Sequence, residues 1–126
     1  MKVSVIIPTY NEEKDIVECL QSLEKQTYKD FEVIVIDDGS GDKTKQLVES
    51  IKPEKYKLIF LQQRHEGPGV ARNLGVKHAK GEIVVFVDAD MTFDKKFLQM
   101  LVSPIIARKA TGTWSRDEYV QHWDNP

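Results

Sequence analysis

The sequence has little cysteine, no long apolar run and almost no net charge. Each of these absences argues against a class of protein. Cys19 is the only cysteine in 126 residues, so no internal disulfide can form, which fits a reducing compartment. No apolar run approaches the roughly 20 residues of a membrane helix. The first residues, MKVSVIIPTYNEE, meet proline and acids too soon for a signal peptide. We therefore expect a cytoplasmic chain with no transmembrane segment.

Motifs for several other functions are also missing. The formal net charge is −2 and no basic stripe is present, so nucleic acid is not an expected partner. Neither G-x-G-x-x-G nor a P-loop occurs, which argues against dinucleotide-binding proteins and NTPases. His65, His78 and His122 have no metal-ligand spacing, and we expect them to be surface or partly buried residues.

The apolar residues that are present predict an α/β fold. Short apolar runs predict strands at residues 2–7, 31–36, 56–61 and 83–87. Apolar residues at helical spacing predict a helix after each of these strands. Strands that alternate with helices require parallel pairing and right-handed crossovers. The sequence therefore predicts a Rossmann-like, mostly parallel sheet with helices on both faces.

Individual residues predict where these elements begin and end. Pro8 is expected to end the first strand, because proline cannot donate to a ladder. Asn11 is expected to cap the first helix, which should run to about residue 26, and Asp94 is expected to cap the fourth. Gly81 is expected to cap the end of the third helix. A capping box at 115–118 predicts a short last helix in the tail.

The stretch EIVVFVDADMT, residues 82–92, carries the strongest chemical signal. Its apolar run leads directly into Asp88 and Asp90, at the strand end where α/β sheets bind ligands. Residues i and i+2 of an extended segment point the same way, so both carboxylates can face one cation. Oxygen ligands suit Mg²⁺ or Mn²⁺, which often bridge a carboxylate and substrate phosphates. The alternative is that both aspartates are only polar turn residues.

Polar residues follow two other strands at the same sheet edge. Residues 8–11 end the first strand, and Asp37 and Asp38 end the second. Acidic clusters that face one cleft repel unless a cation separates them or they do separate tasks. One carboxylate accepting N–H groups from a base, and another pair holding a metal on a diphosphate, would satisfy this requirement. Arg72 could reach the same edge, where its guanidinium suits phosphate or carboxylate. Turn chemistry for Asp37 and Asp38, and a solvated helix position for Arg72, remain alternatives.

Four segments together resemble the family-2 glycosyltransferases of GT-A fold, which include dolichyl-phosphate-sugar and polysaccharide synthases. The segments are VSVIIPTYNEE, VIVIDDGS, GPGVARNLG and VFVDAD, in the order and spacing of that family, and they extend from about Val3 to Leu101. The resemblance implies a nucleotide-diphospho-sugar-binding GT-A subdomain at residues 1–110, followed by a tail at 111–126.

The resemblance also implies residue roles. Thr9 and Tyr10 would line the nucleotide pocket, and Asp38, supported by Asp37, would accept a hydrogen bond from the base. Arg72 would lie beside the phosphates. Asp90 would ligate Mg²⁺ or Mn²⁺, with Asp88 facing the ribose or the waters of the metal. The implied substrate-binding residues are Pro8, Thr9, Tyr10, Glu12, Asp37, Asp38, Arg72, Asp88 and Ala89, and the implied metal ligands are Asp90 and Asp88. The family transfers a sugar from a UDP- or GDP-sugar with inversion, and the metal neutralises the leaving diphosphate.

The chain departs from the family pattern after the D-x-D motif. Full-length members carry an acidic catalytic base and acceptor-site strands further downstream, whereas only residues 91–126 follow Asp90 here. Asp117 and Glu118 lie in the capping box and are poor candidates for the base. We therefore expect the nucleotide-sugar half of an enzyme, with no catalytic base and an unknown acceptor. An uncovered fourth strand would be an apolar edge prone to pairing with another copy, so we also expect self-association.

Two other functions compete with this interpretation. The first is a module that binds a nucleotide sugar without turnover. It would keep every residue that binds the sugar donor, and it would differ from a glycosyltransferase only in neither transferring nor hydrolysing the sugar. The run VFVDADMT also resembles the first motif of haloacid-dehalogenase-type phosphatases, in which Asp88 would be the nucleophile. That motif normally lies on the first strand and needs partners more than a hundred residues downstream, for which there is no room.

Overall fold

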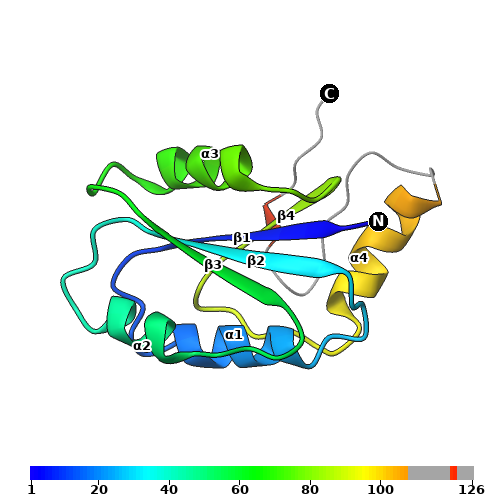
Figure 1. The fold of residues 1–126 in the computed structure, drawn as a ribbon, viewed down its shortest axis with the longest axis horizontal. Helices are drawn as coiled ribbons and strands as arrows, with labels where there is room; N and C mark the ends of the chain where they lie inside the picture. The colour runs from blue at the N-terminus through cyan, green and yellow to red at the C-terminus, as the bar shows by residue number, and fades with distance from the viewer. Residues whose placement is uncertain (108–119, 122–126) are drawn as a thin grey trace.

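A five-stranded sheet in the order β3-β2-β1-β4-β5 forms the centre of the molecule (Figure 1). The computed structural model describes residues 1–107 and 120–121. The elements are β1 Val3–Thr9, α1 Ile16–Glu24, β2 Phe31–Asp37, α2 Thr44–Ser50, β3 Lys57–Gln62, α3 Pro68–His78, β4 Ile83–Val87, α4 Phe97–Ile106 and β5 Val120–Gln121. Strands β1 to β4 are parallel, and β5 pairs with β4 in the antiparallel direction. The predicted α/β class and its four parallel strands are confirmed.

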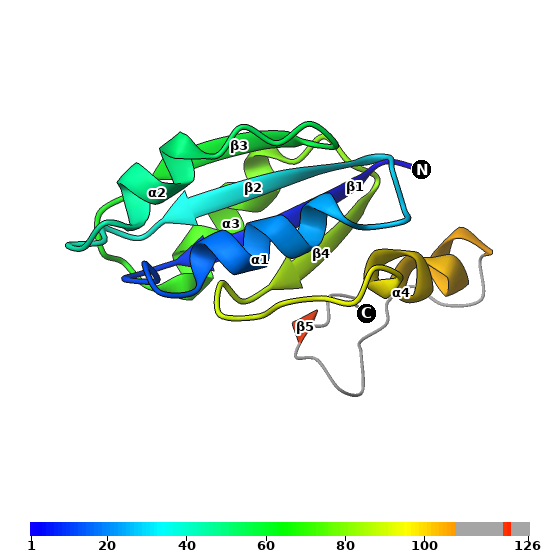
Figure 2. The same ribbon diagram turned by 90° about the horizontal axis from the view of Figure 1, so that it is seen from below.

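Helices cover both faces of the sheet. Helix α3 lies on one face and α1 and α2 lie on the other, as Figures 1 and 2 show. A hydrophobic core lies on each face of the sheet, and successive side chains of β1 point into one and then the other. Val5 packs on the side of α1 and α2, whereas Ile6 packs toward Ala71 of α3. Helix α4 contributes to the core on the α1 side. Because β1, β2 and β4 are buried on both faces, the apolar runs in these parts of the sequence are nearly continuous.

The prediction that Pro8 ends the first strand is wrong by two residues. Strand β1 continues through Pro8 to Thr9, and these two residues pair with Ile36 and Asp37 of β2. On the other side, the pairing of β1 with β4 stops at Ile6, so no ladder hydrogen bond is required there from the proline nitrogen. The extension brings Thr9 to the sheet edge, level with the end of β2.

The helix caps also differ from those predicted. Asn11 is not an N-cap: it has a positive φ of 52°, and α1 begins five residues later, at Ile16. Its Oδ1 instead accepts a hydrogen bond from Gly41 N at 2.9 Å. Asp94 caps the turn before α4, because its Oδ2 accepts a hydrogen bond from Lys96 N at 2.9 Å. Helix α3 ends at His78, and Gly81 lies beyond it, against β1.

The tail contains a strand that the sequence analysis did not predict. Val120 and Gln121 form β5 and pair with Val87 and Phe86, so the carboxyl end of β4 is covered. The capping box at 115–118 lies outside the described residues, as does the boundary expected at 110. Self-association stays a prediction. Within residues 1–107 and 120–121, no helix has the length and apolar character needed to span a membrane.

Candidate functional site

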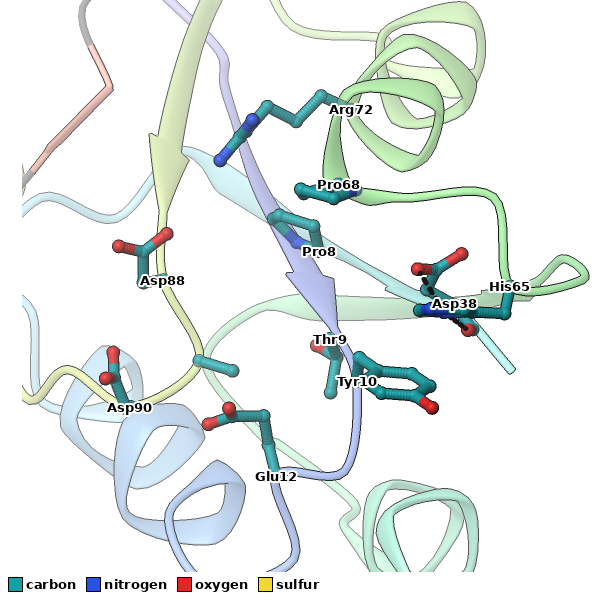
Figure 3. A pocket seen from close by; sticks show the side chains of 11 residues that line it. Pro8, Thr9, Tyr10, Glu12, Asp38, His65, Pro68, Arg72, Asp88 and Asp90 are labelled. Carbon is teal, nitrogen blue, oxygen red and sulfur yellow. Dashed lines mark hydrogen bonds and ion pairs between the residues drawn. The ribbon is translucent and has the colours of Figure 1, made fainter. Parts of the chain in front are cut away.

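A cleft of about 330 Å³ opens at the carboxyl ends of β1, β2 and β4 (Figure 3). Its size suits a small-molecule ligand. It is lined by Pro8, Thr9, Tyr10, Glu12, Asp38, His65, Pro68, Arg72, Asp88, Ala89 and Asp90. Every residue predicted for the site is among these except Asp37. The ends of the parallel strands thus meet at one cleft, and His65 and Pro68 also line it.

Asp37 supports the turn after β2 and does not line the cleft. It is buried, and its carboxylate accepts hydrogen bonds from the Ser40 hydroxyl at 2.5 Å and from Ser40 N at 3.3 Å. Successive residues of an extended segment point in opposite directions, so only one of the two adjacent aspartates can face the ligand. The sequence could not show which one, and turn chemistry accounts for Asp37.

Asp38 anchors the loop that joins β3 to α3. Its Oδ1 accepts hydrogen bonds from Gln63 Nε2 at 2.8 Å and from Glu66 N at 2.8 Å. Its Oδ2 accepts one from Gly67 N at 3.1 Å and lies 3.0 Å from Nδ1 of His65. Burial opposes ionisation of Asp38, but these hydrogen bonds outweigh it and hold the pKa of Asp38 below its ordinary value.

Asp38→Asn is expected to lower the free energy of unfolding by about 1–3 kcal/mol, because the amide cannot accept from all the buried N–H groups that face it. Because the pKa of Asp38 is lower in the folded chain than in the unfolded chain, its ionised carboxylate stabilises the fold at pH values above its ordinary pKa. This stabilisation is lost as the pH falls through the pKa of the folded chain. The stability difference between wild type and Asp38→Asn should therefore be complete near neutrality and shrink below about pH 4. Urea denaturation at several pH values measures it. Equal stabilities at pH 7 would contradict the anchoring role.

Carboxylates concentrate at the other end of the cleft. Asp88 and Asp90 follow β4, and Figure 3 shows the Glu12 carboxylate pointing toward Asp90. Burial and the charge of Asp90 raise the pKa of Asp88, while Arg72 opposes that rise. Burial and the charge of Asp90 also raise the pKa of Glu12. This end of the cleft is therefore a region of unbalanced negative charge.

The donor atoms at this end fit a hard divalent cation that is shared with a ligand. The charge of Asp90 raises the pKa of both Glu12 and Asp88, and a bound cation would remove that repulsion. Among the described residues, no group of three or more His, Cys, Asp or Glu side chains forms a closed metal site. Carboxylates in an open cleft match the way Mg²⁺ is held between one or two protein carboxylates and substrate phosphates. Arg72, whose Nε is buried and unpaired, extends from α3 toward the same space (Figure 3).

A hydrogen-bonded clamp joins the loop after β1 to the loop after β2. Asn11 N donates to Ser40 Oγ at 2.9 Å, and Glu12 N donates to the hydroxyl of the buried Thr44 at 2.9 Å. In the opposite direction, Lys43 N donates to Glu13 Oε1 at 3.1 Å. Each segment thus donates hydrogen bonds to the other, and the two are fixed together. Tyr10 and Glu12 on one loop are therefore held in place relative to Asp38 on the other.

His65 is exposed, as predicted for a surface histidine, and it also lines the cleft. Its ring stacks on Tyr10, with ring centroids 4.2 Å apart and planes inclined by 26°. The side chain is 59% exposed. The absence of metal-ligand spacing among the histidines carried no information about this placement. The useful signal was its place just before G-P-G, in a loop that returns to the edge where the other strands end.

The chain matches the family model described as glycosyl transferase family 2 over residues 4–124. It is 47% identical over 102 residues to the poly(ribitol-phosphate) beta-N-acetylglucosaminyltransferase TarS of Staphylococcus aureus. That alignment covers 79% of this chain and 18% of TarS, so the chain spans less than a fifth of this relative.

Solved structures show the same fold. The crystal structure of S. aureus TarS 1–349 in complex with UDP-GlcNAc superposes with a TM-score of 0.76 at 45% identity, covering 86% of this chain and 32% of that one. The mannosyltransferase PcManGT from Pyrobaculum calidifontis, in complex with GDP-Man and Mn²⁺, superposes with a TM-score of 0.71 at 36% identity. That match covers 76% of this chain and 30% of PcManGT. These neighbours are GT-A glycosyltransferases, so the predicted GT-A fold is confirmed, and the phosphatase interpretation is left without support.

Proposed function

The chain belongs to glycosyl transferase family 2, and on that premise we propose that its cleft binds the nucleotide-diphosphate sugar from which a glycosyltransferase takes its sugar. The observation that carries the proposal is the placement of two different groups at opposite ends of one cleft. Tyr10 and Asp38 form one end, and Asp88 and Asp90 form the other. A nucleotide-diphosphate sugar has matching parts, because a flat base lies at one end and a diphosphate at the other.

The Tyr10 end supplies the contacts that a base needs. The Tyr10 ring has an aromatic face, and the carboxylate of Asp38 is an acceptor that a ring N–H group could use in place of one of its present donors. The depressed pKa keeps Asp38 ionised, so it accepts and does not donate. Thr9, at the end of β1, lies between the two ends of the cleft (Figure 3), where it would face the sugar of the nucleoside.

The carboxylate end supplies what a diphosphate needs if a divalent cation accompanies it. Asp90 and Asp88 would hold Mg²⁺ or Mn²⁺ against the phosphate oxygens, and the guanidinium of Arg72 would donate to them. When bound, the cation stabilises the negative charge that develops on the leaving diphosphate. Asp88 and Asp90 alone repel a diphosphate, so nucleotide binding should depend on the cation. The Mn²⁺ in the complex of PcManGT with GDP-Man supports this proposal.

Transfer with inversion requires a base that deprotonates the acceptor on the face of the sugar opposite the diphosphate. The described carboxylates of the cleft are Glu12, Asp38, Asp88 and Asp90, and the proposed placement of the nucleotide and the cation puts all of them on the side of the sugar donor. A nucleotide-sugar-binding module without turnover is therefore the second candidate for this chain taken alone.

Titration calorimetry with UDP and GDP, each with and without Mn²⁺, tests the proposal. We expect micromolar to millimolar binding of at least one nucleotide in the presence of Mn²⁺ and loss of that binding in excess EDTA. UDP is the first ligand to test, because the TarS complex with UDP-GlcNAc is more similar to this chain than the GDP-Man complex. A folded chain that binds neither nucleotide would refute the proposal. Release of UDP from a bound UDP-sugar would distinguish an enzyme from a binding module.

A further inference from the structure

The ring of His65 makes the two contacts that the proposed function assigns to a nucleotide base. It stacks on the face of Tyr10, with ring centroids 4.2 Å apart. Its Nδ1 lies 3.0 Å from Oδ2 of Asp38 and 3.2 Å from the backbone oxygen of the same residue. Figure 3 shows His65 and Asp38 side by side at the end of the cleft where Tyr10 lies. A flat nitrogen heterocycle of the chain itself thus already occupies this end.

The carboxylate of Asp38 has no free acceptor position for a base. A carboxylate offers about four lone-pair positions. Asp38 already faces Gln63 Nε2, Glu66 N, Gly67 N and His65 Nδ1. A base that donates an N–H group to Asp38 must therefore displace one of these four groups.

His65 is the group that can leave. Glu66 N and Gly67 N are backbone groups of the loop just before α3 and cannot move without that loop. Gln63 is part-buried and also faces Gly67 O at 3.5 Å. The His65 side chain is 59% exposed, so rotation takes its ring directly into solvent. The space between the rings of Tyr10 and His65 is too narrow for a third ring, since stacked rings are already in contact at this separation.

We infer that His65 is a further residue of the nucleotide site, where its ring stands in for the base in the free protein and is displaced from Tyr10 and Asp38 when a base binds. The inference rests on the proposed function. His65 thereby sets nucleotide affinity, since part of the binding free energy of the base replaces contacts that the protein already makes. In the free protein no acceptor position of Asp38 is left unpaired, because His65 occupies the position that a base would take.

The test is titration of UDP, in saturating Mn²⁺, into wild type, His65→Ala and His78→Ala. His78 is the matched control: it is an exposed histidine at the end of α3, and its Nδ1 lies 3.1 Å from Leu74 O of the same helix. We expect His65→Ala to bind UDP about three- to tenfold more tightly, the worth of one exposed hydrogen bond and one ring contact. His78→Ala should bind like wild type. Inorganic pyrophosphate, which has no base, should bind all three proteins equally.

Proton NMR of wild type gives a second measurement. The ring protons of His65 should carry a ring-current shift from Tyr10 in the free protein and lose it when UDP saturates the site. Weaker or unchanged UDP binding by His65→Ala, or a His65 ring that keeps its shift in the complex, would overturn the inference and leave the proposed function intact. Failure of wild type to bind UDP or GDP would overturn both, so the two failures are distinguishable.

Discussion

Asp90→Asn should remove the Mn²⁺-dependent part of UDP binding, so that the affinity of the variant in Mn²⁺ falls to the affinity of wild type in EDTA. Replacing even the hydrogen-bond partner of a metal ligand changes metal affinity about 10–100-fold, so exchanging the anionic ligand itself for a neutral amide should cost about 100-fold or more. Asp90 is exposed, so the substitution should leave the fold unchanged. Calorimetry at matched Mn²⁺ concentrations measures the change.

Asp30→Asn is the matched control for this experiment. Asp30 is an exposed aspartate just before β2, at the opposite end of the sheet from the cleft. The substitution removes the same charge from the chain and should leave UDP binding unchanged. If both variants weaken binding equally, a general loss of negative charge is responsible and the metal assignment to Asp90 is wrong. If Asp90→Asn binds as wild type does, the cation is held elsewhere.

Gly81→Ala should cause the largest loss of stability of any single methyl addition among the described glycines. A Cβ at Gly81 would lie 2.6 Å from Ser4 Oγ, 2.7 Å from Ser4 N and 2.8 Å from Lys2 O. Two of these atoms are backbone atoms, one in β1 and one in the residue just before it, and β1 cannot retreat without breaking its pairing with β4. Gly81 N also donates to Ser4 Oγ, which in turn donates to the buried Glu32. We expect a loss of about 2–4 kcal/mol in the free energy of unfolding.

Gly69→Ala is the control for Gly81→Ala. Gly69 lies in the first turn of α3, and nothing is within 4 Å of the position a Cβ would take there. Alanine is the better helix former by about 1 kcal/mol, so this variant should be as stable as wild type or slightly more so. Urea denaturation of both variants measures the difference. A Gly81→Ala variant that unfolds at the same urea concentration as wild type would show that β1 and the turn before β4 adjust freely.

The strands and the location of the cleft could be predicted because they depend on local patterns. The run at 83–87 is β4 to the residue, since a strand buried on both faces needs an unbroken apolar segment. Pro8 was misjudged because the rule for proline depends on which neighbouring strand its nitrogen faces, and that is a property of the assembled sheet. Asn11 was misjudged because its side chain contacts a loop 30 residues away, which local cap preferences do not describe.

The roles of Asp37 and His65 could not be read from the sequence for a related reason. Adjacent aspartates differ only in which way the strand turns them, and a shift of one residue in register would exchange their roles. The importance of His65 depends on its ring meeting Tyr10, from a different loop, across the cleft. The tail strand β5 is two residues long and owes its extended form to pairing with β4, so no periodicity could reveal it.

The clamp between the loops after β1 and β2 has a consequence for how this site can change by mutation. Thr44 holds the backbone of Glu12, and Asn11 holds that of Gly41, so each loop is part of the other's scaffold. Substitutions in the two loops should therefore show strong epistasis, with double variants departing from the sum of the single ones. A library that varies residues 9–13 alone would be enriched in inactive sequences. Varying 40–44 together with them would give directed evolution access to altered nucleotide preferences that neither loop can reach by itself.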